Sequence, residues 1–166
     1  MSVAWANRGM TSTAQIWREI ERCSFAVVSH VTPDGAPRSS GVSYAAEGGR
    51  LYSIVAGDGW KARHLALDGR VAVTVPVHRG GILALLMPIP PATISFHGTA
   101  TVRTDGHVPP KLESLLRNVK HGASAIIEIE PSGRFLTYGI GVPLLKMRDA
   151  AAARGVAPIG QRSLPA

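Results

Sequence analysis

The chain has 166 residues, of which 45% are hydrophobic and 17% are charged. This length fits one domain, and the apolar fraction excludes a chain that is disordered throughout. Eighteen Lys and Arg against eleven Asp and Glu leave a formal charge of +7, which suits nucleic acid, an anionic membrane or a phosphorylated small molecule as partner. The low share of charged residues favours a surface that a partner partly covers, so we expect an oligomer.

The single cysteine, Cys23, excludes an internal disulfide and a cysteine-based metal site. One thiol fits a reducing compartment, and the N-terminus shows no signal-peptide pattern, so we expect a cytoplasmic protein. The longest apolar run, 82–89, is too short to span a membrane, so no membrane partner is expected. Six histidines are scattered without the spacing of a metal motif, and no metal site is predicted.

Along the chain, residues 1–10 are expected to form a flexible arm. Ile16, Trp17 and Ile20 then recur at helical spacing, which predicts a short helix over 13–22. From residue 24 the apolar period becomes that of a strand. Strands are predicted at 25–31, 37–45, 50–55, 70–77, 93–102, 125–129 and 134–140.

Turn residues separate these strands, among them the run Thr32-Pro33-Asp34-Gly35 and a final turn at 131–133 that makes the last two strands a closing pair. Two more helices are predicted, at 60–67 with Leu65 and Leu67 turned inward, and from 109 to about 120. An apolar insert at 78–91 is expected to contact a second subunit, with the wall of a substrate pocket as the alternative.

The predicted fold is mainly β, an antiparallel barrel of six or seven strands with short helices, because closure removes exposed sheet edges. One domain is expected over 11–142. It is followed at 143–166 by a basic C-terminal extension that carries three of the seven net positive charges. We expect this extension to be a solvated tail rather than a nucleic-acid arm, since no stretch interleaves cations with aromatics.

The side chains alone offer little chemistry. The chain contains no nucleophile-elbow, P-loop or dinucleotide-binding motif, so an enzyme of this sequence would take its reactivity from a cofactor. A cationic cluster, Lys61, Arg63 and His64, stands at the start of a predicted helix, and Arg38 begins a neighbouring strand. Such a helix start suits a phosphate group, and an ordinary surface helix explains it equally well.

The order of these features resembles the pyridoxamine 5′-phosphate oxidase-like family. The first matching stretch, 25–42, is an apolar strand, a turn at Asp34-Gly35 with Pro37 after it, and then small polar residues. The second is a strand at 51–54 followed by the Lys61 helix, a turn and an apolar strand to 73. Segments 94–100 and 126–131 resemble later strands of the family, so the likeness covers most of the chain.

This resemblance implies a split-barrel flavin-binding fold and a homodimer with two flavin sites at its interface. Residues 38–42 would line the isoalloxazine ring and ribityl chain, Ser53 and Lys61 would reach the phosphate, and Trp60 stands where many members carry a basic residue. Arg63 could replace that missing cation, or the ligand could differ. The cofactor-binding residues implied are Arg38, Ser39, Ser40, Gly41, Val42, Ser53, Trp60, Lys61 and Arg63.

The function implied is a flavin-dependent oxidoreductase that passes hydride to or from a small organic substrate. Flavin mononucleotide (FMN) is the expected cofactor, and the deazaflavin coenzyme F-420 is the alternative, which the excess of Arg over Lys and the basic C-terminal segment favour. No side chain is assigned as catalytic, although His97 and Tyr138 are candidate proton donors. A flavin-binding module without turnover is a second hypothesis, and a nucleic-acid-binding barrel, short of stacking aromatics, is a third.

Overall fold

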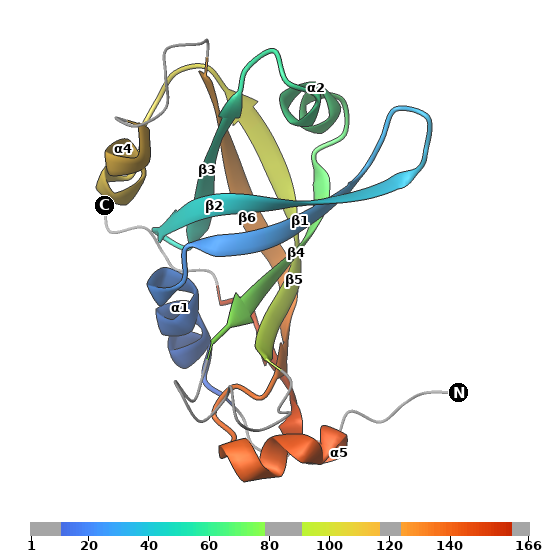
Figure 1. The fold of residues 1–166 in the computed structure, drawn as a ribbon, viewed down its shortest axis with the longest axis vertical. Coiled ribbons are helices and arrows are strands. Elements are labelled where there is room, and N and C mark those ends of the chain that lie inside the picture. The colour runs from blue at the N-terminus through green and yellow to red at the C-terminus, as the bar shows by residue number, and fades with distance from the viewer. Residues whose placement is uncertain (1–10, 79–90, 117–123, 161–166) are drawn as a thin grey trace.

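A computed structural model of the chain describes residues 11–78, 91–116 and 124–160 (Figure 1). The expected N-terminal arm, nearly all of the apolar insert and the last six residues lie outside the described residues. The end of the helix predicted from residue 109 also falls outside them. Within the described ranges, no helix is long and apolar enough to cross a bilayer.

Seven antiparallel strands form one sheet in the described part of the chain. Their order is β3-β2-β1-β4-β5-β6-β7, and an additional pairing of β3 with β6 closes the first six into a barrel (Figure 1). The strands are β1 (Phe25–Val31), β2 (Pro37–Glu47), β3 (Arg50–Ala56), β4 (Arg70–Val77), β5 (Ala92–Arg103), β6 (Ser124–Tyr138) and β7 (Arg154–Pro158). The predicted antiparallel barrel is therefore confirmed.

Short helices surround the barrel. They are α1 (Thr13–Arg22), α2 (Trp60–Leu67), α4 (Pro110–Leu116), the 3-10 helix η1 (Leu144–Arg148) and α5 (Ala150–Ala153). Both α1 and α2 have the bounds that the sequence predicts. The prediction for Leu67 is wrong, since its side chain is 74% exposed while Leu65 is buried. Residues two apart on a helix point in different directions, so only one of these leucines can face the barrel.

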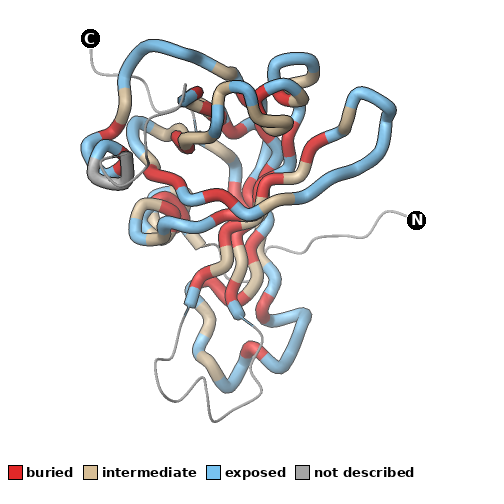
Figure 2. The backbone as a smooth tube through the Cα atoms, turned by 45° about the horizontal axis from the view of Figure 1, so that its top comes forward, coloured by how far each residue is buried: buried red, intermediate tan, exposed pale blue. Residues whose placement is uncertain are grey.

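The interior is filled by alternate strand residues, as the two-residue period of a strand requires. Phe135 is fully buried and packs edge-to-face against Trp17 and Phe96, with ring centroids 5.5 Å apart in each pair. Trp17 belongs to α1, which is further tied to β2 by a hydrogen bond from the Tyr44 hydroxyl to the Ile20 carbonyl oxygen, 2.7 Å long. Figure 2 shows the buried residues where the strands cross, while the tip of the β1–β2 hairpin is exposed.

The predicted closing pair of strands around Pro131 is wrong. The structure has one long strand there, β6, and both of its halves pair with β5. The register shifts by a bulge, because Ser95 lies opposite Leu136 whereas His97 lies opposite Ser132. Gly133 provides the bend with a φ of +78°, a conformation open to glycine. A turn-like sequence thus makes a kink, because β5 is long enough to pair with the chain on both sides of it.

The C-terminal extension is part of the fold as far as it is described, and the expectation of a solvated tail is wrong there. Strand β7 pairs with β6 from Arg134 opposite Pro158 to Tyr138 opposite Arg154. The Tyr138 hydroxyl donates a 2.7 Å hydrogen bond to the carbonyl oxygen of Met147, whose side chain is fully buried. Tyr138 therefore holds η1 against the sheet, which gives this side chain a structural role.

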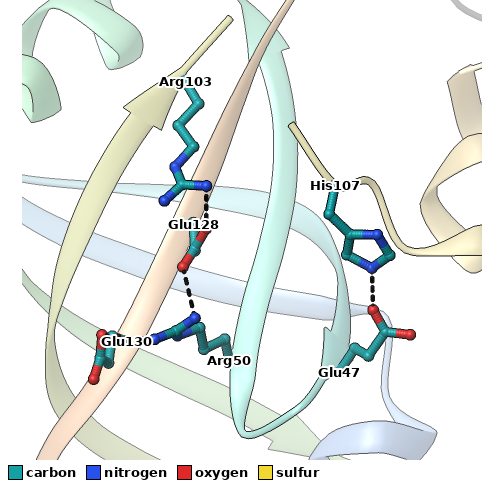
Figure 3. A network of polar contacts seen from close by, with 6 residues as sticks. All are labelled: Glu47, Arg50, Arg103, His107, Glu128 and Glu130. Atoms are coloured by element: carbon teal, nitrogen blue, oxygen red, sulfur yellow. Dashed lines mark hydrogen bonds and ion pairs between the residues drawn. The ribbon is translucent and has the colours of Figure 1, made fainter. Parts of the chain in front are cut away.

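An ionic network covers one side of the barrel (Figure 3). Glu128 on β6 is paired with Arg50 of β3 at 3.3 Å and with Arg103 of β5 at 3.4 Å. Arg50 also reaches Glu130 at 3.3 Å, and His107 contacts Glu47 nearby. Both glutamates of β6 thus have cationic partners. They join neighbouring strands and do not form a free carboxylate pair.

Candidate cofactor site

In the described part of the chain, the first half of β2 has an open edge. Residues 37–43 pair with β1 on one side, and β3 joins the other side only from Tyr44 onwards. The Lys61 ammonium donates a 3.1 Å hydrogen bond to the carbonyl oxygen of Gly41, and the Ser53 hydroxyl donates one of 2.8 Å to that of Ser43. These two carbonyl groups therefore point away from β1, and strand geometry turns the main-chain groups of Ser39 the same way.

The open edge faces the first turn of α2, which brings three side chains together. His30 and Arg38 are direct partners across β1 and β2, so they share one face of the hairpin. The Arg38 guanidinium lies over the Trp60 ring, with Cζ 4.2 Å from the ring centroid. The His30 ring stacks on the same indole at 5.7 Å between centroids and 22° between planes. Trp60 is half-buried, and it forms a platform that joins both strands to α2.

A pair of hydrogen-bonded histidines, His30 and His64, adjoins the Trp60 platform. His30 Nε2 and His64 Nδ1 are 3.1 Å apart and share a hydrogen bond. His30 is buried, with 5% of its surface exposed. Burial lowers the pKa of His30, and the neighbouring His64, Arg38 and Lys61 lower it further. His30 is therefore neutral at neutral pH.

A small cavity of about 10 Å³ lies beneath the platform, which is room for no more than one water molecule. Its lining combines apolar barrel residues with the polar groups of the cradle: Val28, His30, Ser40, Val42, Ser53, Lys61, Leu65, Ile127 and Ile129. No cofactor ring fits inside it. A ring would have to lie along the open edge of β2, outside the cavity.

Glycine at position 41 serves a close contact that comes from within the chain. A Cβ at this position would lie 2.7 Å from Cε2 of the Phe25 ring. A side chain at Gly41 would thus collide with the Phe25 ring, and the carbonyl group of Gly41 points to Lys61. The small residues of β2 were expected to admit a flavin ring, and at Gly41 it is the Phe25 ring that approaches. This leaves the edge of β2, rather than its outer face, for a ligand.

Most of the residues predicted for the cofactor site lie together. Arg38, Ser40, Gly41, Val42, Ser53, Trp60 and Lys61 all line the cradle, here defined as the open edge of β2, the first turn of α2 and the cavity between them. Ser39 lies on the outer face of the hairpin, where its hydroxyl bonds that of Ser29 at 2.7 Å. Arg63 is exposed and forms no side-chain hydrogen bond or ion pair with the described residues.

The structure therefore places Arg38, and not Arg63, beside Trp60 and Lys61. Neither Arg38 nor Lys61 has an acidic partner among the described residues. Asp34, in the β1–β2 turn, is the acid close enough to His64 to interact with it, and its own pKa is lowered chiefly by the Thr32 hydroxyl. Two cations without acidic partners beside an aromatic ring suit an anionic group on a planar ligand.

Sequence reasoning missed the pairing of His30 with His64, although His64 had been placed in the cationic cluster. The signal was present in β1, where Ala26, Val28 and His30 occupy the inward phase. A polar side chain at an inward position needs a hydrogen-bond partner. Its partner stands 34 positions away in sequence, so only the fold identifies it.

Comparison with known proteins supports the fold. The family model described as Pyridoxamine 5′-phosphate oxidase matches residues 12–137, which is most of the chain. No curated protein matches.

Three solved structures that share the fold have low sequence identity to the chain. A heme-binding protein from Mycobacterium smegmatis has a TM-score of 0.63 at 15% identity, and the match covers 91% of this chain and 60% of that one. A FAD-binding protein from Mesorhizobium loti has a TM-score of 0.58 at 17% identity, with coverage of 73% and 90%. A protein named F-420 reductase has a TM-score of 0.54 at 19% identity, with coverage of 71% and 93%.

At these identities the structural similarity shows only that the fold is shared. The family match is independent of it, and it spans the barrel from the start of α1 to the end of β6. On that ground the chain belongs to the pyridoxamine 5′-phosphate oxidase family and has its split-barrel fold.

Proposed function

We propose that this chain is a flavin- or deazaflavin-dependent oxidoreductase that holds its cofactor in the cradle. One observation carries the proposal: Arg38 and Lys61 both lie over the Trp60 ring beside the open edge of β2, and neither has an acidic partner among the described residues. Such cations recognise a phosphate ester, while free main-chain groups at a strand edge can bond the heteroatoms of a ring. FMN is the first candidate cofactor, and F-420 is the second.

The residues present fit such a group. Lys61 and Arg38 would hold its phosphate, the main chain of Ser39 and the N–H of Gly41 would bond polar atoms of the ring or ribityl chain, and Trp60 would offer a stacking surface. When bound, the cofactor supplies hydride transfer to or from a small organic substrate. The chain binds and orients it, and the barrel beneath the cradle excludes water.

A homodimer completes the proposal, because the outer face of the sheet suits a partner. One row of residues crosses five strands there, namely Gly41, Val27, Thr74, Ser95 and Leu136. Leu136, in this row, and Phe25, two residues before Val27 on the same face of β1, are about half exposed. The hydroxyls of Thr74 and Ser95 bond each other at 3.0 Å, so this face can be covered without leaving them unpaired. The occupant we propose is a second copy of the chain.

Substitution of Lys61 tests the cofactor site, and Arg63 supplies a matched control two positions on. Lys61→Ala should weaken the binding of FMN or F-420 about tenfold or more, because it removes a charge-assisted contact. Arg63→Ala removes the same charge from the same helix outside the cradle and should leave affinity unchanged. Equal effects of the two substitutions would contradict the site.

A hydride-transfer assay separates the enzyme from a binding module. The loaded protein would be mixed with several acceptors, and the absorbance of the cofactor followed. Turnover supports the oxidoreductase, whereas tight binding with no turnover on any acceptor supports storage or electron relay.

Heme binding is a second candidate function, because two fold relatives carry names that refer to heme binding or storage. Addition of hemin to the purified wild type decides this case. A saturable Soret shift would support heme, and its absence would leave the flavin proposal.

A further inference from the structure

The His30–His64 pair is placed to hold a proton. In the neutral pair, one imidazole N–H points at the lone pair of the other ring, at 3.1 Å between nitrogens. One added proton goes to an outer ring nitrogen and turns this contact into a charge-assisted hydrogen bond, which is stronger. A second added proton would set two N–H groups against each other. The pair can therefore accept one proton without losing its contact.

The charges around the pair oppose that proton. His30 faces Arg38 from β2, and both Lys61 and His64 from α2, while Asp34 of the β1–β2 turn acts on His64. Arg38 and Lys61 thus both repel a proton on His30, and burial disfavours it further. Asp34 is exposed, and a side-chain contact with Thr32 already engages it.

We propose that an oxyanion bound by Arg38 and Lys61 draws a proton onto the His30–His64 pair, so that ligand binding and protonation are coupled. The proposal rests on the proposed function, which assigns these two cations to a phosphate group. A doubly charged oxyanion, such as a phosphate ester, would offset the positive charge that disfavours a proton on His30. Coupling is reciprocal, so the same ligand binds more tightly as the pH falls through the titration of the pair.

The protonated pair also strengthens the platform. His30 stacks on Trp60, and a charged imidazolium interacts more favourably with an indole face than a neutral ring does. Arg38, which lies over the same indole, is at that point engaged by the ligand. Binding of an anion therefore tightens the contact between β1 and α2 at the cradle.

Sulfate is the probe, because it stays doubly charged throughout the titration and contributes no proton of its own. The ring signals of His30 would be followed by NMR as the pH is changed, in sulfate and in chloride of equal ionic strength. We expect sulfate to raise the midpoint of His30 by about half a pH unit or more, which linkage equates with roughly threefold tighter sulfate binding. His97, exposed on β5, is the internal control and should not move.

Two variants test whether the charge of Lys61 causes the shift of the His30 midpoint. Lys61→Met should raise the His30 midpoint without any sulfate, because one repelling charge is gone, and should abolish most of the sulfate effect. Arg63→Met should do neither. Since both positions lie on the surface side of α2, the backbone amide spectrum of each variant checks that the fold is retained.

Each outcome is decisive. A sulfate-dependent shift at His30 that Lys61→Met removes supports the coupling. Sulfate binding that involves Lys61 but leaves the His30 midpoint unchanged overturns the coupling and leaves the cofactor site standing. Sulfate that perturbs neither Lys61 nor His30 overturns the coupling together with the anion site, and no flavin is needed to learn this.

Discussion

The guanidinium of Arg38 lies over the Trp60 ring, with Cζ 4.2 Å from the centroid of the indole. Lys61 stands over the same ring at 5.6 Å. The indole of Trp60 thus gathers cations from two elements, β2 and α2. The ring that positions these charges can also stack on a planar ligand.

Replacement of Trp60 should expose this positioning role. A cation–π contact at a part-exposed site is worth about 0.5–1 kcal/mol, so Trp60→Ala should weaken cofactor binding roughly two- to fivefold. Trp60→Phe keeps a ring face and should recover most of the affinity. Titration of both variants with the cofactor checks this, and equal affinity in the wild type and Trp60→Ala would show that the stack has no part in binding.

A charge on the outer face of the sheet should break the proposed dimer. Leu136 is 47% exposed in the row of residues that crosses the outer face, so Leu136→Glu should give a folded monomer. Leu67→Glu, at a leucine that is 74% exposed on α2, serves as the control and should remain dimeric. Sedimentation of the three proteins measures the outcome, and a dimeric Leu136→Glu protein would exclude this face as the interface.

A close approach of two strands should make Gly98 irreplaceable. A Cβ there would lie 2.7 Å from the carbonyl oxygen of Glu130 and 3.2 Å from Cγ2 of Ile129. Because the nearest atom belongs to the backbone, Gly98→Ala should lower the free energy of unfolding by about 1–3 kcal/mol. Thr99→Ser, on the exposed face of the same strand, should change it by less than about 0.5 kcal/mol. Urea unfolding measures these differences. An unchanged free energy of unfolding in Gly98→Ala would show that the strands can separate here without cost.

The turn before β4 should contribute a pH-dependent part of the stability. Asp68 accepts hydrogen bonds from the backbone and the guanidinium of Arg70, the shortest at 2.6 Å, and these lower its pKa from 3.8 to about 2. A lowered pKa means that the contribution is complete above 3.8 and is lost as the pH falls through about 2. Asp68→Asn should therefore be less stable than the wild type at neutral pH and equal to it below about 2.

Urea midpoints of the two proteins across this range measure the difference. Asp105→Asn, at an exposed aspartate outside any element, is the matched control and should follow the wild type throughout. A constant gap between the wild type and Asp68→Asn down to the lowest pH would contradict the assignment to this carboxylate.

Local patterns sufficed for the first two-thirds of the barrel. The helix that carries Lys61 has its predicted bounds because Gly59 precedes it and Asp68-Gly69 follows it, signals that need no tertiary contact. The bend of β6 was misjudged because Gly133 has the chemistry of a turn, and only pairing of both halves with β5 shows it to be a bulge. Strand β7 is short and has little apolar periodicity, so only its pairing with β6 identifies it as a strand.

The sequence predicts which residues belong to the site better than it predicts how they are arranged. Trp60 and Lys61 follow from the start of α2, but the choice of Arg38 over Arg63 as the second cation depends on how the β1–β2 hairpin faces the helix. The contact between His30 and His64 likewise joins a strand to a helix distant in sequence. Such relationships require the closed barrel, which sequence periodicity predicts only in outline.

The most direct test of the account is a titration of the purified wild-type protein with FMN and, separately, with F-420, followed by fluorescence. The account predicts that one of the two binds in the micromolar range or tighter, with quenching of tryptophan emission that Trp60→Phe reduces. The cofactor preferred would also limit the search for substrates to its chemistry. Failure of both cofactors to bind would contradict the proposed oxidoreductase.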